Sequence, residues 1–141
     1  MLTIITDNQW KVDFNLSLPS LEPHIAGVNN LIKFSVASQN SPPIFFTSSV
    51  GAVGKWNEKY PNELVPEMAI DDPDVAECQG YSESKWIAER LLYAAGKKCG
   101  LSSAICRVGQ ISGPVEREGK GKWNTQEWLP SVSPHISYIL C

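Results

Sequence analysis

Two residues spaced four apart, Tyr81 and Lys85, are the clearest candidates for chemistry in this sequence. On a helix, residues at this spacing project from the same face, one turn apart. A phenol has a reference pKa of roughly 10, and a nearby ammonium is expected to stabilise the phenolate and lower that pKa. Tyr81 could then exchange a proton with a substrate carbonyl oxygen. The same spacing also arises by chance on solvated helix faces, so the neighbouring elements decide between the two interpretations.

Ser49 is a third candidate, because it follows a compact apolar run. The run, residues 44–47, comes after Pro42-Pro43, which blocks helix continuation, and its composition predicts a strand buried on both faces. A hydroxyl at the tip of this strand could donate a hydrogen bond to the same carbonyl oxygen and help to hold the developing oxyanion. Ser49, Tyr81 and Lys85 would then converge on one carbonyl group.

Hydrophobic periodicity and helix-capping signals predict the elements that carry these residues. Apolar side chains recur every three to four residues between positions 20 and 38, with Pro23 in the first turn, which is typical of an amphipathic helix. The helix that contains Tyr81 begins at Gly80, has Lys97-Lys98 near its end and Gly100 just beyond it. The remaining predicted elements are a strand end at 4–5, a long loop at 54–80 and a strand at 103–108.

The order of these elements is strand, helix, strand, long loop, helix and strand. This order predicts an α/β fold built from parallel βαβ units. In such sheets, ligands bind beyond the carboxyl ends of the strands. Ser49 and Gly109 both follow a predicted strand, so the sequence places its polar candidates at the functional edge of the sheet.

Composition excludes several classes of function. A formal net charge of −3 and a pI of about 5.3 leave no basic surface for nucleic acid or an anionic membrane. No apolar run approaches the roughly 20 residues that span a bilayer. The N-terminus lacks the pattern of a secretory signal, so we expect a cytoplasmic location. The cysteines and histidines show no zinc-ligand spacing, and no metal site is expected.

The order of serine, tyrosine and lysine resembles the extended short-chain dehydrogenase/reductase superfamily. Five segments narrow the resemblance: Trp10–Asn15, Pro23–Val28, Gly80–Trp86, Arg107–Ile111 and Trp123–Trp128. They are similar to the terminal thioester reductase domains, of the NAD-binding male-sterility type, of fungal adenylate-forming reductases and related non-ribosomal peptide synthetase-like enzymes. The segments cover most of the chain between residues 10 and 130.

The resemblance implies a doubly wound, Rossmann-like parallel sheet and a specific reaction. An acyl thioester on the phosphopantetheine arm of a carrier domain would be reduced with hydride from NADPH to an aldehyde or alcohol. Ser49 and Tyr81 would bind the carbonyl oxygen, Tyr81 would protonate it, and Lys85 would tune Tyr81 and hold the nicotinamide ribose. The residues implied near the nicotinamide are Val108, Gly109 and Gln110.

The sequence departs from the family pattern in several places, among them Asp7-Asn8-Gln9, where the family pattern has His-Asn-Ala before the tryptophan. No Gly-rich turn joins a first strand to a first helix, and residues 51–54 and 119–121 have the wrong spacing for phosphate binding and are interpreted as plain loops. His24 stands where extended reductases often carry a relay asparagine; it is either a relay member or a packed or exposed helix residue. Residues 131–141 also leave the pattern.

These departures predict a single partial NAD(P)-binding domain over residues 1–141, truncated at both ends. It would lack the N-terminal Gly-rich βαβ half of a Rossmann-like sheet. We therefore expect weak NADPH binding and impaired reduction by this chain alone. Two alternatives stay open: a non-catalytic fragment or interaction module derived from a reductase, and a sugar-nucleotide epimerase or dehydratase of the same superfamily. The segment Trp123–Trp128 speaks against the second.

Overall fold

The computed structural model describes residues 2–111, and the strands and helices among them belong to one unit, Met1–Gly109. The strands are β1 (Ile5–Asp7), β2 (Ile44–Ser49) and β3 (Ser103–Val108), and the helices are α1 (Glu22–Ala37), α2 (Trp56–Lys59) and α3 (Gly80–Cys99). Short 3₁₀ turns are η1 (Leu18–Leu21), η2 (Val50–Val53) and η3 (Pro73–Val75). Within residues 2–111, no helix has the length and apolar character needed to cross a membrane.

The three strands form a parallel sheet in the order β1, β2, β3. Ile5 pairs with Ile44, Ile44 pairs with Ser103, and Ser49 pairs with Val108. The predicted α/β fold, with parallel strands separated by helices, is therefore confirmed. Because β2 and β3 run in the same direction and end opposite each other, the residues that follow them lie at one edge of the sheet.

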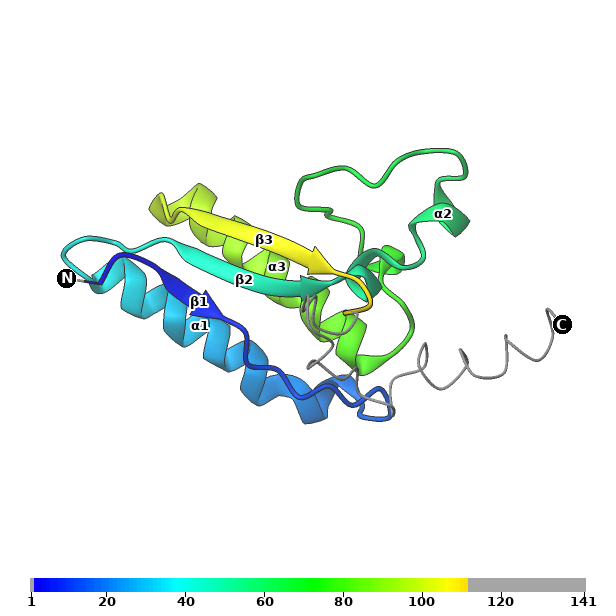
Figure 1. The fold of residues 1–141 in the computed structure, drawn as a ribbon, viewed down its shortest axis with the longest axis horizontal. Helices are drawn as coiled ribbons and strands as arrows, with labels where there is room; N and C mark the ends of the chain where they lie inside the picture. The colour runs from blue at the N-terminus through cyan, green and yellow to red at the C-terminus, as the bar shows by residue number, and fades with distance from the viewer. Residues whose placement is uncertain (1, 112–141) are drawn as a thin grey trace, which may run out of the picture. The chain divides into compact units, whose positions relative to one another are not determined.

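Helices α1 and α3 both cover one face of the sheet (Figure 1). Their apolar stripes meet the inward side chains of β2 in a core formed by Val28, Ile32, Ile44, Phe46, Ala88, Leu92, Ala95 and Leu101. Because side chains alternate along a strand, Phe45 lies on the opposite face, where it is 36% exposed. The prediction that this strand is buried on both faces is thus wrong for residues 2–111, in which helices cover one face alone.

Helix α3 has the ends that its sequence predicts. Gly100 follows the helix with a φ of 69°, a left-handed conformation that glycine adopts without steric cost, and its N–H donates to the Gly96 carbonyl at 3.1 Å. Lys97 and Lys98 occupy the last turn, where positive charge interacts favourably with the helix dipole. These contacts stabilise the C-terminal end of α3, the helix whose first two turns carry Tyr81 and Lys85.

The long loop between β2 and α3 folds back on itself. The N–H of Lys55 donates to the Val75 carbonyl at 2.9 Å, and the Lys59 ammonium pairs with Asp72 at 2.6 Å. A second, smaller core forms inside the loop from Val53, Trp56, Ile70 and Val75. The long loop predicted from the sequence is confirmed, and it contains two short helical segments, α2 and η3.

The start of α3 passes very close to the segment that precedes η1. A Cβ placed on Gly80 would lie 2.5 Å from the Leu16 carbonyl oxygen and 2.5 Å from the Ser17 carbonyl carbon. Both are backbone atoms, which cannot rotate away as a side chain can. The absence of a side chain at Gly80 therefore allows α3 to begin here, directly before Tyr81.

Gly80→Ala is expected to lower the free energy of unfolding by about 1–3 kcal/mol, because the added methyl group forces two backbone segments apart. Gly27→Ala is the matched control, since a Cβ at this other helical glycine meets nothing within 4 Å. The free energy of unfolding of this variant should rise by roughly 0.5–1 kcal/mol, because alanine has a higher helix propensity than glycine. Urea denaturation followed by circular dichroism measures both. Equal effects of the two substitutions would show that the close approach at Gly80 has no energetic weight.

Candidate active site

The three side chains predicted from the sequence to act together meet at the carboxyl end of β2. Tyr81, in the first turn of α3, is 9% exposed, and its phenol forms a side-chain hydrogen bond with Ser49. Lys85, one turn later, is 3% exposed, and its Nζ donates to the Thr47 carbonyl at 2.6 Å. The Ser49 hydroxyl oxygen also accepts the Gly51 N–H at 3.2 Å. The structure therefore brings all three predicted groups together.

Aromatic rings surround the ammonium of Lys85. Its Nζ lies 4.2 Å from the ring centroid of Trp10, 4.8 Å from that of Phe46 and 5.8 Å from that of Tyr81. At these distances the ring faces attract a cation and replace part of its lost hydration. The ammonium is therefore held between β2, α3 and the segment that follows β1.

Burial changes the acidity of both central groups. It lowers the pKa of Lys85 to about 8, an effect that the negative charges of Asp7 and Glu89 oppose. Burial also raises the pKa of the Tyr81 phenol, and a hydrogen bond with a neighbouring hydroxyl opposes that change. The prediction that the ammonium lowers the phenol pKa is thus wrong here, because desolvation dominates at Tyr81 and Lys85 donates to the Thr47 carbonyl. Tyr81 holds its proton at neutral pH.

Trp10 links the segment after β1 to α3. Its indole N–H donates to Ser84 Oγ at 3.1 Å, and that hydroxyl donates to the Tyr81 carbonyl at 2.7 Å. His24 of α1 stacks on Trp10, with ring centroids 5.2 Å apart and an interplanar angle of 28°. Phe14 meets the Tyr81 ring edge to face at 5.2 Å. His24 is therefore a packed helix residue in this structure, and a relay role for it stays a prediction.

A buried ion pair lies one turn beyond Lys85. Glu89 is 1% exposed, and its carboxylate accepts hydrogen bonds from Arg107 Nε at 3.1 and 3.2 Å and from Nη2 at 2.7 Å. The hydroxyl of Ser48 donates to the same carboxylate at 2.5 Å. Burying a carboxylate is costly unless opposite charge and hydrogen bonds replace its hydration. Arg107 and Ser48 provide both.

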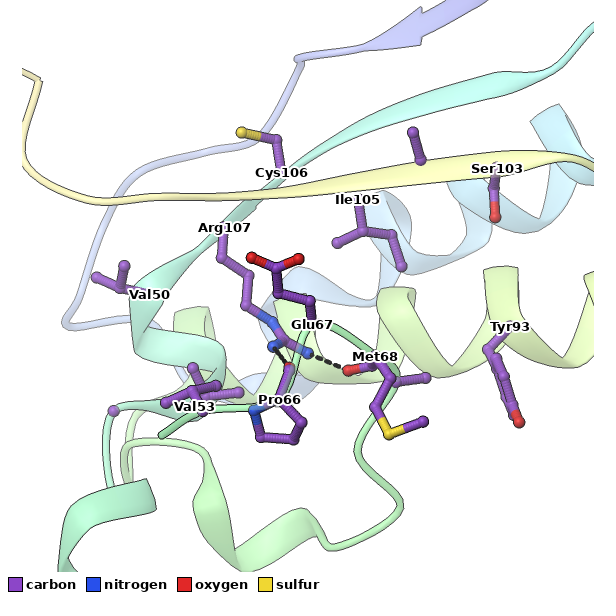
Figure 2. Close-up of a pocket in the computed structure, with 14 residues that line it drawn as sticks. Val50, Val53, Pro66, Glu67, Met68, Tyr93, Ser103, Ile105, Cys106 and Arg107 are labelled. Carbon is purple, nitrogen blue, oxygen red and sulfur yellow. Dashed lines mark hydrogen bonds between the residues drawn. The ribbon is translucent and has the colours of Figure 1, made fainter. Parts of the chain in front are cut away.

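Arg107 also reaches the long loop. Its Nη1 donates to the Pro66 carbonyl at 3.2 Å and its Nη2 to the Met68 carbonyl at 3.0 Å (Figure 2). A cavity of about 920 Å³ lies between this loop and β3, and Val50 and Ile105 are among its lining residues. Because Val50 directly follows β2, one end of the cavity adjoins the functional edge of the sheet.

The residues expected near a nicotinamide divide into two groups. Val108 pairs with Ser49 in the parallel register, and Gly109 follows it directly, so both lie beside the site. Among the described residues, a Cβ on Gly109 would meet Val50 Cγ1 at 3.8 Å, an ordinary van der Waals contact. Gln110 belongs to the second unit of the chain, residues 110–141, and its placement near a nicotinamide stays a prediction.

The glycines that follow β2 serve packing. A Cβ on Gly51 would collide with the Ser82 hydroxyl, and one on Gly54 would lie 2.5 Å from Glu77 Cγ. Residues 51–53 belong to η2 and are buried, so the prediction of a plain loop is wrong for them, and only Gly54 lies outside the turn. Residues 119–121 and the segment Trp123–Trp128 lie outside the described residues.

Similarity to known proteins covers nearly the whole chain. The sequence profile of the NAD-binding male sterility protein family matches residues 2–135. The chain belongs to this family. It is 39% identical over 135 residues to a carboxylic acid reductase of Neurospora crassa, covering 96% of this chain and 12% of that protein. It is 42% identical over 133 residues to the adenylate-forming reductase Nps10 of Heterobasidion annosum, covering 93% of this chain and 12% of that protein.

Solved structures with a similar fold include reductase domains. The terminal R domain of the myxalamid PKS-NRPS pathway has a TM-score of 0.64 and 23% identity, covering 92% of this chain and 31% of that one. A thiolation-reductase di-domain of an archaeal non-ribosomal peptide synthetase has a TM-score of 0.61 and 24% identity, covering 75% and 23%. The predicted resemblance and the Rossmann-like fold class are both confirmed, with this chain matching part of such a domain.

Three residues shape the candidate site without having been assigned a role from the sequence: Trp10, Glu89 and Arg107. The spacing gave a signal for Glu89, because it follows Lys85 by four positions and so shares its face of the helix. An acid buried on that face requires a positively charged partner. Arg107 follows Ile105 by two positions on β3, so both side chains point to the helix-covered face. Trp10 gave no such signal, because its hydrogen-bond partner is 74 positions away.

The lowered pKa of Lys85 predicts that stability depends on pH. Between the folded value of about 8 and the ordinary value of 10.5, the unfolded chain binds more protons at this residue, so the free energy of unfolding rises with pH. The raised pKa of Tyr81 makes the free energy of unfolding fall with pH, but only above the ordinary phenol pKa of 10.0. From about pH 8 to about pH 10, the wild-type chain should gain at most roughly 1.4 kcal/mol per pH unit relative to Lys85→Met.

Urea denaturation across this pH range measures the difference between the two proteins. Lys98→Met removes an exposed lysine from the last turn of the same helix and is the matched control. Its stability should run parallel to that of the wild type. A difference between wild type and Lys85→Met that stays constant with pH would contradict the lowered pKa.

Proposed function

We propose that this chain carries the carbonyl-binding and proton-donating part of an NADPH-dependent reductase of acyl thioesters. The observation behind the proposal is the meeting of the Ser49 hydroxyl, the Tyr81 phenol and the Lys85 ammonium at the carboxyl edge of the sheet. The names of its fungal relatives, carboxylic acid reductase and adenylate-forming reductase, support reduction at the level of a carboxylic acid derivative. Ser49, Tyr81 and Lys85 are the proposed catalytic residues.

Two hydroxyls that share a hydrogen bond can also reach one carbonyl oxygen. As hydride adds to the carbonyl carbon, negative charge develops on that oxygen, and the O–H groups of Ser49 and Tyr81 stabilise it. Tyr81 then transfers its proton to the oxygen, because an alkoxide is a stronger base than a phenolate. The buried ammonium of Lys85 stabilises the phenolate that remains. Collapse of the hemithioacetal releases the thiol and an aldehyde, and a second reduction gives an alcohol.

A reduced nicotinamide fits the residues beside these groups. An ammonium has three N–H donors, and within residues 2–111 the Thr47 carbonyl engages one of those of Lys85, so others can hold ribose hydroxyls. Val108 and Gly109 would flank the nicotinamide, where Gly109 presents no side chain. When bound, the cofactor supplies the hydride. The choice of NADPH over NADH rests on the family resemblance.

The proposed substrate is an acyl thioester on the phosphopantetheine arm of a carrier domain. Terminal reductase domains are structurally similar to this chain, and one of them is joined to a thiolation domain. We also propose that residues 1–141 belong to one partial reductase domain that acts in the cytoplasm. The chain spans 12% of the length of its fungal relatives, so catalysis is best tested within a complete relative.

Catalysis can be tested in a chimera in which residues 2–111 replace the matching segment of the Neurospora crassa carboxylic acid reductase. Tyr81→Phe should lower the rate of NADPH oxidation with an acyl thioester by roughly 10²- to 10⁴-fold, because the proton donor is lost. Ser49→Ala should lower it by roughly 10²- to 10³-fold, because one hydrogen-bond donor to the oxyanion is lost.

The matched control is Tyr93→Phe, which removes a phenol hydroxyl from an exposed position of the same helix. This variant should keep the rate of the parent chimera. A folded chimera without activity would contradict the proposed function, and so would an undiminished rate in Tyr81→Phe.

The 141-residue chain by itself is expected to bind NADPH weakly or not measurably. Residues 2–111 present no Gly-rich turn from strand to helix whose amides could hold a pyrophosphate, and Gly51 and Gly54 are engaged in packing. Isothermal titration calorimetry measures the affinity, with the chimera as the positive control. Tight, stoichiometric binding by the chain alone would refute this expectation.

A further inference from the structure

The buried pair of Glu89 and Arg107 adjoins the proposed site but has no part in the chemistry above. A buried ion pair is weak evidence for a stabilising role, because well-packed apolar side chains of similar volume often stabilise a protein as much or more. The pair must also keep one carboxylate, one guanidinium and one hydroxyl in compatible orientations. Its place in the core therefore points to a role in geometry and charge rather than in stability alone.

One hydrogen bond, the strand register and the helix spacing connect this pair to the proposed catalytic residues. The Ser48 hydroxyl donates to the Glu89 carboxylate at 2.5 Å and so fixes the residue directly before Ser49. Arg107 lies opposite Ser48 in the parallel register, so the pair joins the ends of β2 and β3. Glu89 follows Lys85 by one helical turn, and its charge acts on the ammonium.

We propose that Glu89 and Arg107 form a positioning pair, which holds the ends of β2 and β3 in register and places a fixed negative charge one helical turn from Lys85. The fork of the guanidinium, with its donors on both carboxylate oxygens, restricts rotation of either side chain. Arg107 extends the restraint to the long loop through two backbone carbonyls. The purpose of the pair rests on the proposed function, whereas its effect on Lys85 does not.

Charged and titratable groups approach Lys85 from every element packed around it. Those described are Asp7 of β1, Tyr81 and Glu89 of α3, His24 of α1 by way of Trp10, and Arg107 of β3 by way of Glu89. Asp7 and Glu89 supply the two negative charges that act on the ammonium. Asp7 is half-buried, whereas Glu89 is fully buried and bonded on both oxygens. Glu89 is therefore the negative neighbour held in one place.

The test measures the titration of Lys85 directly in the full chain by NMR. Lysine labelled with ¹³C at Cε gives a signal that follows protonation, and its loss in Lys85→Met assigns it. The midpoint should lie at about 8 in the wild type. It should fall by roughly one pH unit in Glu89→Gln, because the ammonium loses a negative neighbour and Arg107 loses its partner. Glu83→Gln, on the same helix and without an ion pair among residues 2–111, should leave it unchanged.

An unchanged midpoint in a folded Glu89→Gln protein overturns the proposal. Where this variant does not fold, Glu89→Gln combined with Arg107→Gln replaces the pair by two neutral amides and leaves no unpaired buried charge. The double variant should still lower the midpoint, because Glu89 acts on Lys85 from one turn away while Arg107 lies beyond it. An unchanged midpoint in the double variant overturns the proposal equally.

The positioning role is measured in the chimera through kcat, KM and the pH–rate profile. Arg107→Lys keeps the charge and loses the fork, so kcat should fall roughly ten- to hundredfold with little change in KM. Glu89→Gln should move the profile to lower pH by roughly one unit, as in the titration. A lower Tm with normal kcat and an unmoved profile would show a purely structural pair and overturn the assignment. Full activity in Tyr81→Phe would instead overturn the proposed function, without altering the titration of Lys85.

Discussion

The burial of the Lys85 ammonium is the constraint from which the geometry of the site follows. Its Nζ donates to the Thr47 carbonyl of the central strand, so one charged group fixes α3 against β2. Sliding the helix along the sheet would leave a cation in apolar surroundings, and an uncompensated buried charge costs several kcal/mol. With that register set, Tyr81 must lie one turn earlier, above the end of β2, where Ser49 is found.

The surroundings of this ammonium compensate for its lost hydration from several directions. Rings of Trp10 and Phe46 lie within cation–π distance, and the charges of Asp7 and Glu89 act on it through space. Because these interactions compensate only in part, the pKa of Lys85 is lowered to about 8. With this pKa the ammonium is mostly protonated near neutral pH. Burial of this charge therefore costs some stability, as the lowered pKa shows.

The structural core and the candidate catalytic residues lie in different parts of the fold. Helices α1 and α3 and their shared core cover one face of the sheet (Figure 1). The candidate residues gather at its carboxyl edge. Arg107 connects that edge to the long loop, whose own small core holds its shape. This division is general in α/β folds, where rigid elements fix the strand ends and the connections supply the surroundings of the site.

The sequence by itself determined the elements and the spacing of the site, because both depend on local geometry. Gly100 and the lysines before it ended α3, and one helical turn set the separation of Tyr81 and Lys85. The tertiary structure alone decided acidities and distant partners. The phenol pKa rises where the spacing suggested a fall. Phe45 is 36% exposed where full burial was expected, and Trp10 forms a hydrogen bond across 74 positions. Desolvation and contact depend on which surfaces pack together, and packing is a property of the whole fold.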